Sequence, residues 1–425
     1  MSKLQGFALF LVAALLFLVV NRAAYKGYFQ DDEMNNLSWT PAVPVMDYVL
    51  TELSPRFQPN NFRPTGHFYF YAAEKLFGLR FPGYVAILHA IHLLNVWLLW
   101  RLARRLGASA LAAAAGCAFF AFHMALFDVF WKPMYVFDLL CGTFCLASTL
   151  LFVRGQWILS FVSFWIAYKA KELAVMLPVV LLCYELWFGS RRWKPLLPFF
   201  AASFSFGLQG ILLNPNHDND YTFRFSLTAL AKTVPFYLGR ILLVPLAGAA
   251  AVPVSRDKNR RLYFGLAMAL TLALPLFFLP GRLYSAYCYV PFTGLALAIS
   301  GLAADVRPAW LALALAAWIP LDYHELRARR SETLARDTDI RAYISTLGQF
   351  VHNNQSVTAW IFSRTPDGFQ SWGVEGALKY LLHTNSLDLH ELHDPETTAL
   401  LPRDSTALLA WDQGAHQLTI TRNTR

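Results

Sequence analysis

The sequence has little charge. Only 15% of its 425 residues are Asp, Glu, Lys or Arg, whereas 56% are hydrophobic. Soluble domains typically carry about 25% charged residues. A water-soluble fold of this length would form two or three domains and would need more charge to cover them. Most of the chain is therefore expected to face lipid, which excludes a soluble enzyme, a nucleic-acid binder and a disordered protein.

Cysteine is also scarce, and the last quarter of the chain has no apolar run long enough to cross a bilayer. All five cysteines lie in apolar segments, so no disulfide framework is expected. Residues 1–321 hold 26 Lys+Arg against 14 Asp+Glu, a net charge of +12, and residues 322–425 hold 10 against 13, a net of −3. The sequence predicts a transmembrane domain over 1–321, including an outer loop at 25–80, and a soluble domain over 322–425.

Apolar runs of about 20 residues predict about eleven membrane-spanning helices. Alternate short loops hold twelve basic residues, from Arg101 to Arg307, against Asp257 and Asp305, which places these loops in the cytoplasm. An odd number of spans then puts the amino terminus inside and residues 25–80 and the tail outside, in the periplasm of a bacterium. The expected spans are 4–20, 82–100, 109–127, 134–153, 156–170, 173–188, 195–213, 227–250, 262–279, 284–302 and 309–321.

Carboxylates gather at the outer ends of the expected spans. Asp31, Asp32 and Glu33 open the 25–80 loop, Asp128 lies at an outer boundary, and Asp138 falls inside a span. A solvated loop start, and for Asp138 an ion pair with a neighbouring helix, are the structural alternatives. A partly buried carboxylate is suited to act as a general base, and charge inside a membrane points to function. Because Asp31 and Asp32 adjoin, we expect only one of them, in an irregular loop, to point into a cavity.

Cations occupy the same outer face. Arg63, Lys169, Lys171 and Arg282 lie there, and the two lysines go against the positive-inside pattern. Snorkelling of the lysines is the structural alternative. Cations that hold a phosphate, next to a carboxylate that deprotonates an acceptor, suit transfer of a group from a lipid-anchored phosphate donor.

The order of these motifs resembles the GT-C glycosyltransferases, and within them the protein O-mannosyltransferases and the tetratricopeptide-bearing membrane mannosyltransferases. The resemblance covers roughly residues 20–200. The family's His-Pro-x-His-x-Glu reads His123-Met-Ala-Leu-Phe-Asp128 here, and the tetratricopeptide array is missing. The motifs that carry the resemblance are Asp31-Asp32-Glu33, Arg63-Pro64, residues 88–95, His123-x4-Asp128, the run from Lys171-Glu172 to Tyr184-Glu185-Leu186, and a weaker echo at 282–291.

The resemblance implies an α-helical polytopic membrane enzyme that transfers a sugar with inversion from a polyprenyl-phosphate donor to an outer acceptor, without a metal. The possibility that residues 31–33 bind a divalent cation stays open. The implied partners are the donor, membrane lipids and a protein or glycolipid acceptor, with no nucleic acid. The implied residues are Asp31, Asp32 and Asp128 for catalysis, Arg63, Lys171 and Arg282 for the donor phosphate, and Glu33, His67, Lys132, Asp138 and Glu172 for substrate binding.

Three other functions stay open at this point. A polymerase or ligase that uses a polyprenyl-diphosphate glycan should have a large outer loop late in the chain, and 214–226 is short. A transporter, with Asp138 and Glu185 as translocation residues, should show repeat halves, and the sequence shows no internal repeat. A membrane scaffold is the third possibility.

The tail predicts a small α/β domain. Helical spacing covers 327–352, strand patterns cover 356–362, and a second helix is expected over 374–382. Residues 407–411 and 417–421 read as a hairpin around Gly414. A further group lacks metal-ligand spacing and is expected to form a polar loop: His383, Asp388, His390, His393 and Asp394. We expect this domain to recognise the acceptor or to stabilise the protein.

Overall fold

The computed structural model describes residues 3–56, 62–213, 220–242, 259–392 and 405–422. The chain divides into two compact units. The first consists of Met1–Arg22, Met46–Gly66 and Ala86–Arg327, and the second of Ala23–Val45, His67–Val85 and Ala328–Arg425. The sequence predicts a boundary after residue 321, whereas this division falls after Arg327 and also groups Ala23–Val45 and His67–Val85 with the C-terminal part.

The first unit is built of helices, and every expected span coincides with one. Within the described residues, five segments are long and apolar enough to cross a membrane: Phe81–Arg105, Ala110–Trp131, Pro133–Val153, Arg260–Phe277 and Ser285–Asp305. Residues 243–250 of one expected span, and residues 256–258 of a basic loop, lie outside the described residues. The helices are α1 (Lys3–Val20), α5 (Phe81–Arg105), α6 (Ala110–Phe122), α7 (Phe127–Trp131), α8 (Val136–Val153), α9 (Trp157–Ala170), α10 (Leu177–Trp187), α11 (Leu197–Leu212), α12 (Leu227–Leu242), α13 (Arg260–Phe277), α14 (Tyr289–Asp305) and the first part of α15 (Pro308–Asn353).

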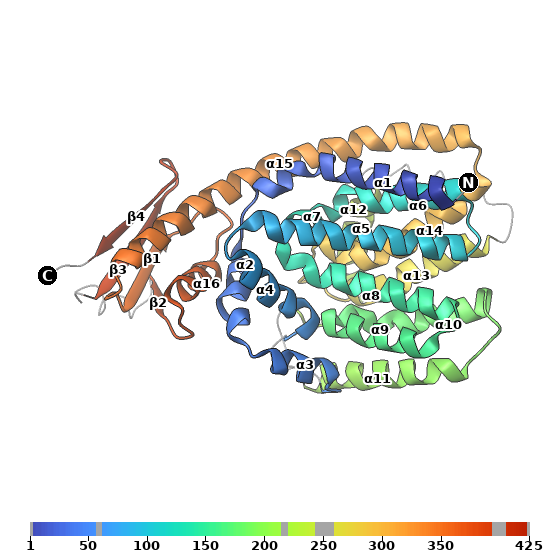
Figure 1. The fold of residues 1–425 in the computed structure, drawn as a ribbon, viewed down its shortest axis with the longest axis horizontal. Helices are drawn as coiled ribbons and strands as arrows, with labels where there is room; N and C mark the ends of the chain where they lie inside the picture. Colours follow the sequence, from blue (N-terminus) through green and yellow to red (C-terminus); the bar gives the residue numbers. More distant parts are fainter. Residues whose placement is uncertain (1–2, 57–61, 214–219, 243–258, 393–404, 423–425) are drawn as a thin grey trace. The chain divides into compact units, whose positions relative to one another are not determined.

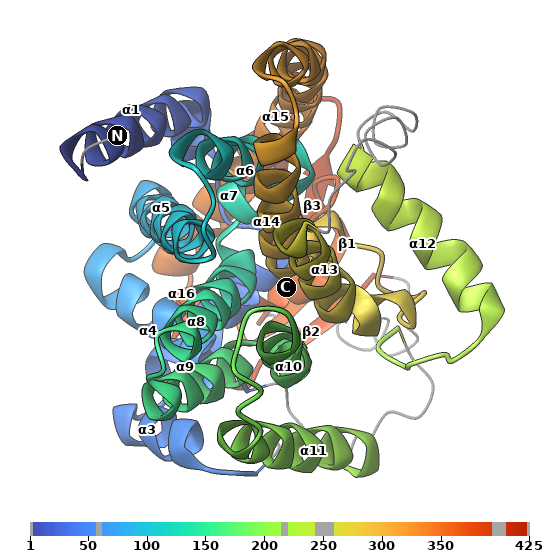
Figure 2. The same cartoon turned by 90° about the vertical axis from the view of Figure 1, so that its right-hand side faces the viewer.

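Most of these helices run side by side (Figure 1). Helix α14 packs between α6 and α13, and α8 packs on α9 (Figure 2). Small residues allow the close approach of α13 and α14: a Cβ atom on Gly294 would lie 2.8 Å from the carbonyl oxygen of Gly265. At the start of α14, the Tyr289 hydroxyl bonds to the ring of His92 and accepts from the amide of Asn95, both at 2.9 Å. These buried contacts tie α14 to α5.

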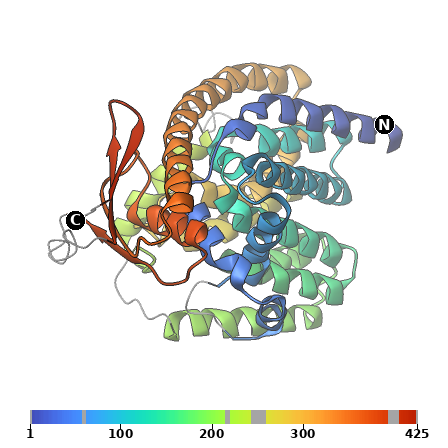
Figure 3. The same ribbon diagram turned by 60° about the vertical axis from the view of Figure 1, so that its left-hand side comes forward.

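The second unit contains a four-stranded sheet in the order β2-β1-β3-β4 (Figure 3). Strand β1 (Ala359–Arg364) is parallel to β2 (Asp388–Glu391) and to β3 (Thr406–Asp412), and β3 pairs antiparallel with β4 (Gln417–Arg422). The later part of α15 packs on the sheet through aromatic rings, with Tyr343 6.1 Å from Trp411 between centroids. The expected small α/β fold is therefore confirmed, including the hairpin and the helix α16 (Ser371–Leu382).

Strand β2 corrects one expectation. The sequence predicts a polar loop at Asp388 and His390, but both residues lie in this strand at the edge of the sheet, where their side chains bond at 2.6 Å. An edge strand has one unpaired side, so its sequence need not be apolar. His393 and Asp394 lie outside the described residues.

The 25–80 loop contains three α-helices: α2 (Asp31–Trp39), α3 (Val45–Leu53) and α4 (Pro64–Phe77). The expectation that Asp31 and Asp32 lie in an irregular loop is wrong, because both belong to the first turn of α2. Gln30 precedes the helix, and its backbone N–H donates to the Glu33 carboxylate at 3.0 Å. Carboxylates are favoured in a first helical turn because they complement the helix dipole.

Candidate active site

Two cations of the first unit contact one tyrosine, Tyr287, and a third interacts with it electrostatically. The Lys171 ammonium lies 3.9 Å from the centroid of its ring, and Arg282 Nη2 donates to its hydroxyl at 3.1 Å. Arg63 is close enough to the same phenol for the two to interact electrostatically. We call Arg63, Lys171 and Arg282 the cation cluster. The structure thus brings together the three residues expected to hold a donor phosphate, although they come from segments far apart in the sequence.

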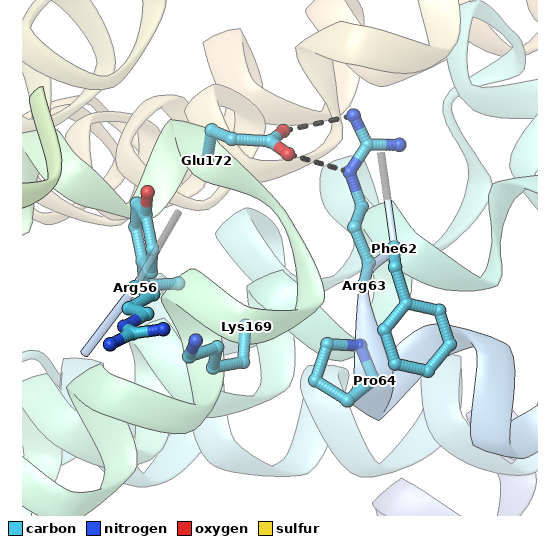
Figure 4. A pocket seen from close by; sticks show the side chains of 7 residues that line it. Arg56, Phe62, Arg63, Pro64, Lys169 and Glu172 are labelled. Atoms are coloured by element: carbon cyan, nitrogen blue, oxygen red, sulfur yellow. Dashed lines mark hydrogen bonds and ion pairs between the residues drawn. The ribbon is translucent and has the colours of Figure 1, made fainter. Parts of the chain in front are cut away.

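Arg63 is held by Glu172. Arg63 Nε and Nη2 donate to the two carboxylate oxygens at 2.8 and 3.0 Å, a two-bond geometry that fixes the plane of the guanidinium (Figure 4). Removal from water raises the pKa of Glu172, but the charge and the hydrogen bonds of Arg63 outweigh this effect and bring that pKa below its ordinary value. Glu172 is therefore a carboxylate that orients Arg63.

Lys171 is paired with Asp138, which lies in the first turn of α8. Its Nζ lies 2.6 Å from Asp138 Oδ1, and the Asp138 side chain is only 2% exposed. This is the ion pair with a neighbouring helix that the sequence left as the alternative for Asp138. Lys171 therefore has two roles. It compensates the charge of the buried Asp138 carboxylate, and it is also a member of the cation cluster.

Arg282 carries the charge that these carboxylates do not balance. The cluster holds three cations, while the ion pairs described above involve two carboxylates, Glu172 and Asp138. The Arg282 guanidinium packs on the rings of Tyr221 and Tyr284 at 4.3 and 4.8 Å. Its Nε is buried and has no hydrogen-bond partner in the described part of the chain. A buried donor without a partner is costly, so this atom is suited to meet an anionic oxygen of a ligand.

Asp128 and Lys132 form a pair of their own in the first unit, with 3.1 Å between Nζ and Oδ1. Asp128 lies on α7, after the short helix that begins at Met124. The backbone N–H of Met124 donates to the carboxylate of Asp322 at 2.8 Å. The sequence placed Asp128 at the outer face, and its catalytic role stays a prediction.

In the second unit, Asp31 and Asp32 both contact the start of α16. The backbone N–H of Gln370 donates to Asp31 Oδ1 at 2.7 Å, and the indole N–H of Trp372 donates to Asp32 Oδ1 at 3.2 Å. Helix α16 comes very close to α2 here, since a Cβ atom on Gly376 would lie 2.6 Å from the backbone nitrogen of Asn35. The tail therefore positions the two candidate bases.

Helix α15 also forms hydrogen bonds with the residues just before α2. Both oxygens of Asp337 accept hydrogen bonds, from the backbone N–H of Tyr28 at 2.9 Å and from the amide of Gln30 at 2.7 Å. Glu33 is buried, and so is His67, whose ring lies 4.8 Å from that of Trp39. Both residues belong to the second unit, and their expected contact with substrate stays a prediction.

Sequence reasoning missed several of the residues that shape these groups. Trp372 and Asp337 lie in a tail to which no chemistry was assigned, and they show no local motif. Tyr287 lies in the segment 282–291 that carried a weak family echo, and its tyrosine-rich composition was the available signal. Among the described residues, no group of three or more His, Cys, Asp or Glu side chains is arranged to hold a metal ion.

No protein-family model and no curated protein matches the chain. Solved structures do. The chain is similar to ArnT from Cupriavidus metallidurans in the apo state (12% identity, TM-score 0.58) and bound to undecaprenyl phosphate (13%, 0.59), each over 100% of this chain and 99% of ArnT. It is also similar to the arabinofuranosyltransferase AftD from Mycobacteria (15%, 0.57), over 97% of this chain and 35% of AftD. At these identities the likeness shows the fold, and it confirms the GT-C architecture that the motifs indicated.

Proposed function

We propose that this chain, a multi-pass membrane protein with the GT-C fold, is a glycosyltransferase that moves a sugar from a polyprenyl-phosphate donor to an outer acceptor. The observation that carries the proposal is the cation cluster. Lys171 and Arg282 meet at Tyr287, and Arg63 interacts electrostatically with the same residue. The buried Nε of Arg282 has no partner in the described residues. The similarity to an ArnT that binds undecaprenyl phosphate supports the same class of donor.

The cations act on the leaving group. Arg63, Lys171 and Arg282 bind the phosphate of the donor, and their positive charge stabilises the charge that develops as the phosphate departs. Glu172 fixes the orientation of Arg63, and Asp138 fixes that of Lys171. Tyr287 contacts two of these cations, the Lys171 ammonium through its ring and the Arg282 guanidinium through its hydroxyl. These contacts reduce the repulsion between the two cations.

A carboxylate acts on the acceptor. The acceptor hydroxyl oxygen attacks the anomeric carbon, the bond between that carbon and the phosphate oxygen breaks, and its electron pair stays with the phosphate. The hydroxyl proton passes to Asp31 or Asp32, of which we favour Asp31, and Asp128 supports the site. Attack opposite the leaving phosphate inverts the configuration. The chemistry needs no metal in this scheme.

The acceptor is a protein hydroxyl, such as that of a pilin, or a glycolipid. We propose a location in the bacterial inner membrane, with the site and the C-terminal domain facing the periplasm, because the basic loops favour the cytoplasm. Glu185, the residue a transporter would use, is instead fixed at 2.9 Å to Arg192, which gives no support to a translocation role.

Incubation of the purified protein with polyprenyl-phosphate sugars and extracytoplasmic acceptors tests the proposal. We expect one sugar mass to be added to an acceptor and polyprenyl phosphate to be released, with no loss of rate on chelator titration. A comparison of secreted proteins and glycolipids from cells with and without the protein identifies the acceptor. If polyprenyl phosphate is released from every donor tested but no acceptor gains a sugar, the proposal of a transferase is wrong.

A further inference from the structure

A pocket in the first unit holds cations that the proposed reaction does not use. It is lined by Arg56, Phe62, Arg63, Pro64, Tyr168, Lys169 and Glu172 (Figure 4). The Arg63–Glu172 pair closes one side and belongs to the cation cluster as well. Arg56 and Lys169 are the additional charges, and neither was assigned to the donor phosphate.

Lys169 is the strongest sign of a ligand. The residue is only 5% exposed, yet its ammonium makes no hydrogen bond or ion pair with any described residue. Its neighbours are the rings of Trp165 and Phe206, 5.9 and 5.7 Å from Nζ. The ammonium is not itself among the fully buried atoms, and an anion in the pocket can therefore reach it and form charge-assisted hydrogen bonds that the surrounding rings do not supply.

The nearby acids do not fill this role. Glu172 is bound by both nitrogens of Arg63. Glu52 attracts Lys169 but forms no ion pair with it, and its carboxylate accepts from the hydroxyl of Thr65 at 2.8 Å. Burial raises the pKa of Glu52, while the hydroxyl of Thr65 and the charge of Lys169 act in the opposite direction. Three cations and two carboxylates leave the pocket with an excess positive charge.

The pocket lies beside apolar surface. Helix α3 carries four exposed apolar side chains at the spacing of one helical face: Met46, Val49, Leu50 and Leu53, which are 46–70% exposed. The last of them precedes Arg56 by three residues. Helix α11 runs next to α3 (Figures 1 and 2), with the amide of Gln209 donating to the carbonyl of Pro55 at 3.0 Å.

Helix α11 adds to the apolar surface with Phe204, Leu208 and Leu212, which are also exposed. An apolar helical face next to cations is how interfacial segments bind anionic lipids.

We propose that Arg56 and Lys169 bind the phosphate of an anionic membrane phospholipid whose acyl chains lie along the apolar faces of α3 and α11. The phosphate oxygens accept charge-assisted hydrogen bonds from the ammonium and the guanidinium, while the chains cover side chains that water would otherwise contact. Arg56 and Lys169 lie outside the cation cluster, so this site adjoins the donor phosphate site and shares only the Arg63–Glu172 pair with it.

Native mass spectrometry of the purified full-length protein tests the proposal. Phosphatidylglycerol is titrated into wild type, Arg56→Gln, Lys169→Gln and the double variant, with phosphatidylcholine as the zwitterionic comparison. We expect about tenfold weaker phosphatidylglycerol binding for each single variant, more for the double variant, and no preference over phosphatidylcholine there. Lys75→Gln, at an exposed lysine of α4, is the matched control and should bind as wild type.

Three results would overturn the proposal. The first is unchanged phosphatidylglycerol binding in Arg56→Gln, a variant at an exposed position that does not disturb the core. The second is displacement of the lipid by inorganic phosphate at equal concentration, since the site would then take a free anion. The third is loss of polyprenyl phosphate binding in Lys169→Gln, since the pocket would then be part of the donor site. None of these readouts depends on sugar transfer.

Discussion

Lys171→Gln is expected to have two effects, on stability and on donor binding, that can be measured separately. Lys171 neutralises Asp138, which is 2% exposed, at 2.6 Å. Removing one partner of a buried ion pair typically costs about 3–5 kcal/mol, because the remaining charge is buried without compensation. The loss of one charge-assisted contact to the donor phosphate costs about 1.5–3 kcal/mol, or roughly 10–150-fold in affinity.

The double variant Lys171→Gln/Asp138→Asn separates the two effects. It removes both charges and keeps side chains of similar size that hydrogen-bond to each other. We expect thermal unfolding of the purified protein to show the large loss in Lys171→Gln and recovery of most of it in the double variant. Binding of polyprenyl phosphate should stay roughly 10–150-fold weaker in both. If the double variant binds donor as wild type does, Lys171 serves Asp138 alone and the cation cluster is not a phosphate site.

Other expected outcomes follow from the same geometry. Arg282→Gln should weaken polyprenyl phosphate binding by about tenfold or more with little change in stability, because Arg282 is bound to the Tyr287 hydroxyl rather than to a carboxylate; equal affinity would contradict its role. Trp372→Phe should lower kcat by about tenfold at unchanged donor KM, since it removes the hydrogen bond to Asp32 but keeps an aromatic ring; an unchanged kcat would mean that the contact does not position the carboxylate. A reporter enzyme that functions only in the periplasm should be active when it is fused after Arg425. Activity of a reporter that functions only in the cytoplasm would place the second unit on the wrong side of the membrane.

The sequence was most informative where lipid imposes a strict requirement. A backbone in a bilayer must form helices of about 20 apolar residues, so the expected spans coincide with helices. Lys171 stood out because it opposes the charge pattern of the loops. Its partner Asp138 lies 33 residues earlier, and no local pattern reveals such a pair. The sequence therefore drew attention to these charges but did not show how they pair.

The second unit was harder to predict for the same reason. The contact of Asp31 with Gln370 joins residues 339 apart, and a backbone N–H leaves no trace in side-chain identity. Helix α2 is short and polar, with three carboxylates in its first turn, so it read as a loop. Tertiary contacts, rather than intrinsic helix propensity, stabilise such a segment.

Turnover of Asp31→Asn and Asp32→Asn in the purified protein tests the central claim most directly. An asparagine at position 31 keeps an oxygen that can accept from the N–H of Gln370, so the contact between α2 and α16 survives while the ability to take a proton is lost. We predict that turnover of Asp31→Asn falls by about 10²–10⁴-fold, the usual contribution of general-base catalysis, while polyprenyl phosphate binds as in wild type. Near-normal turnover in both variants would contradict the account, because no carboxylate of this pair would then be the base.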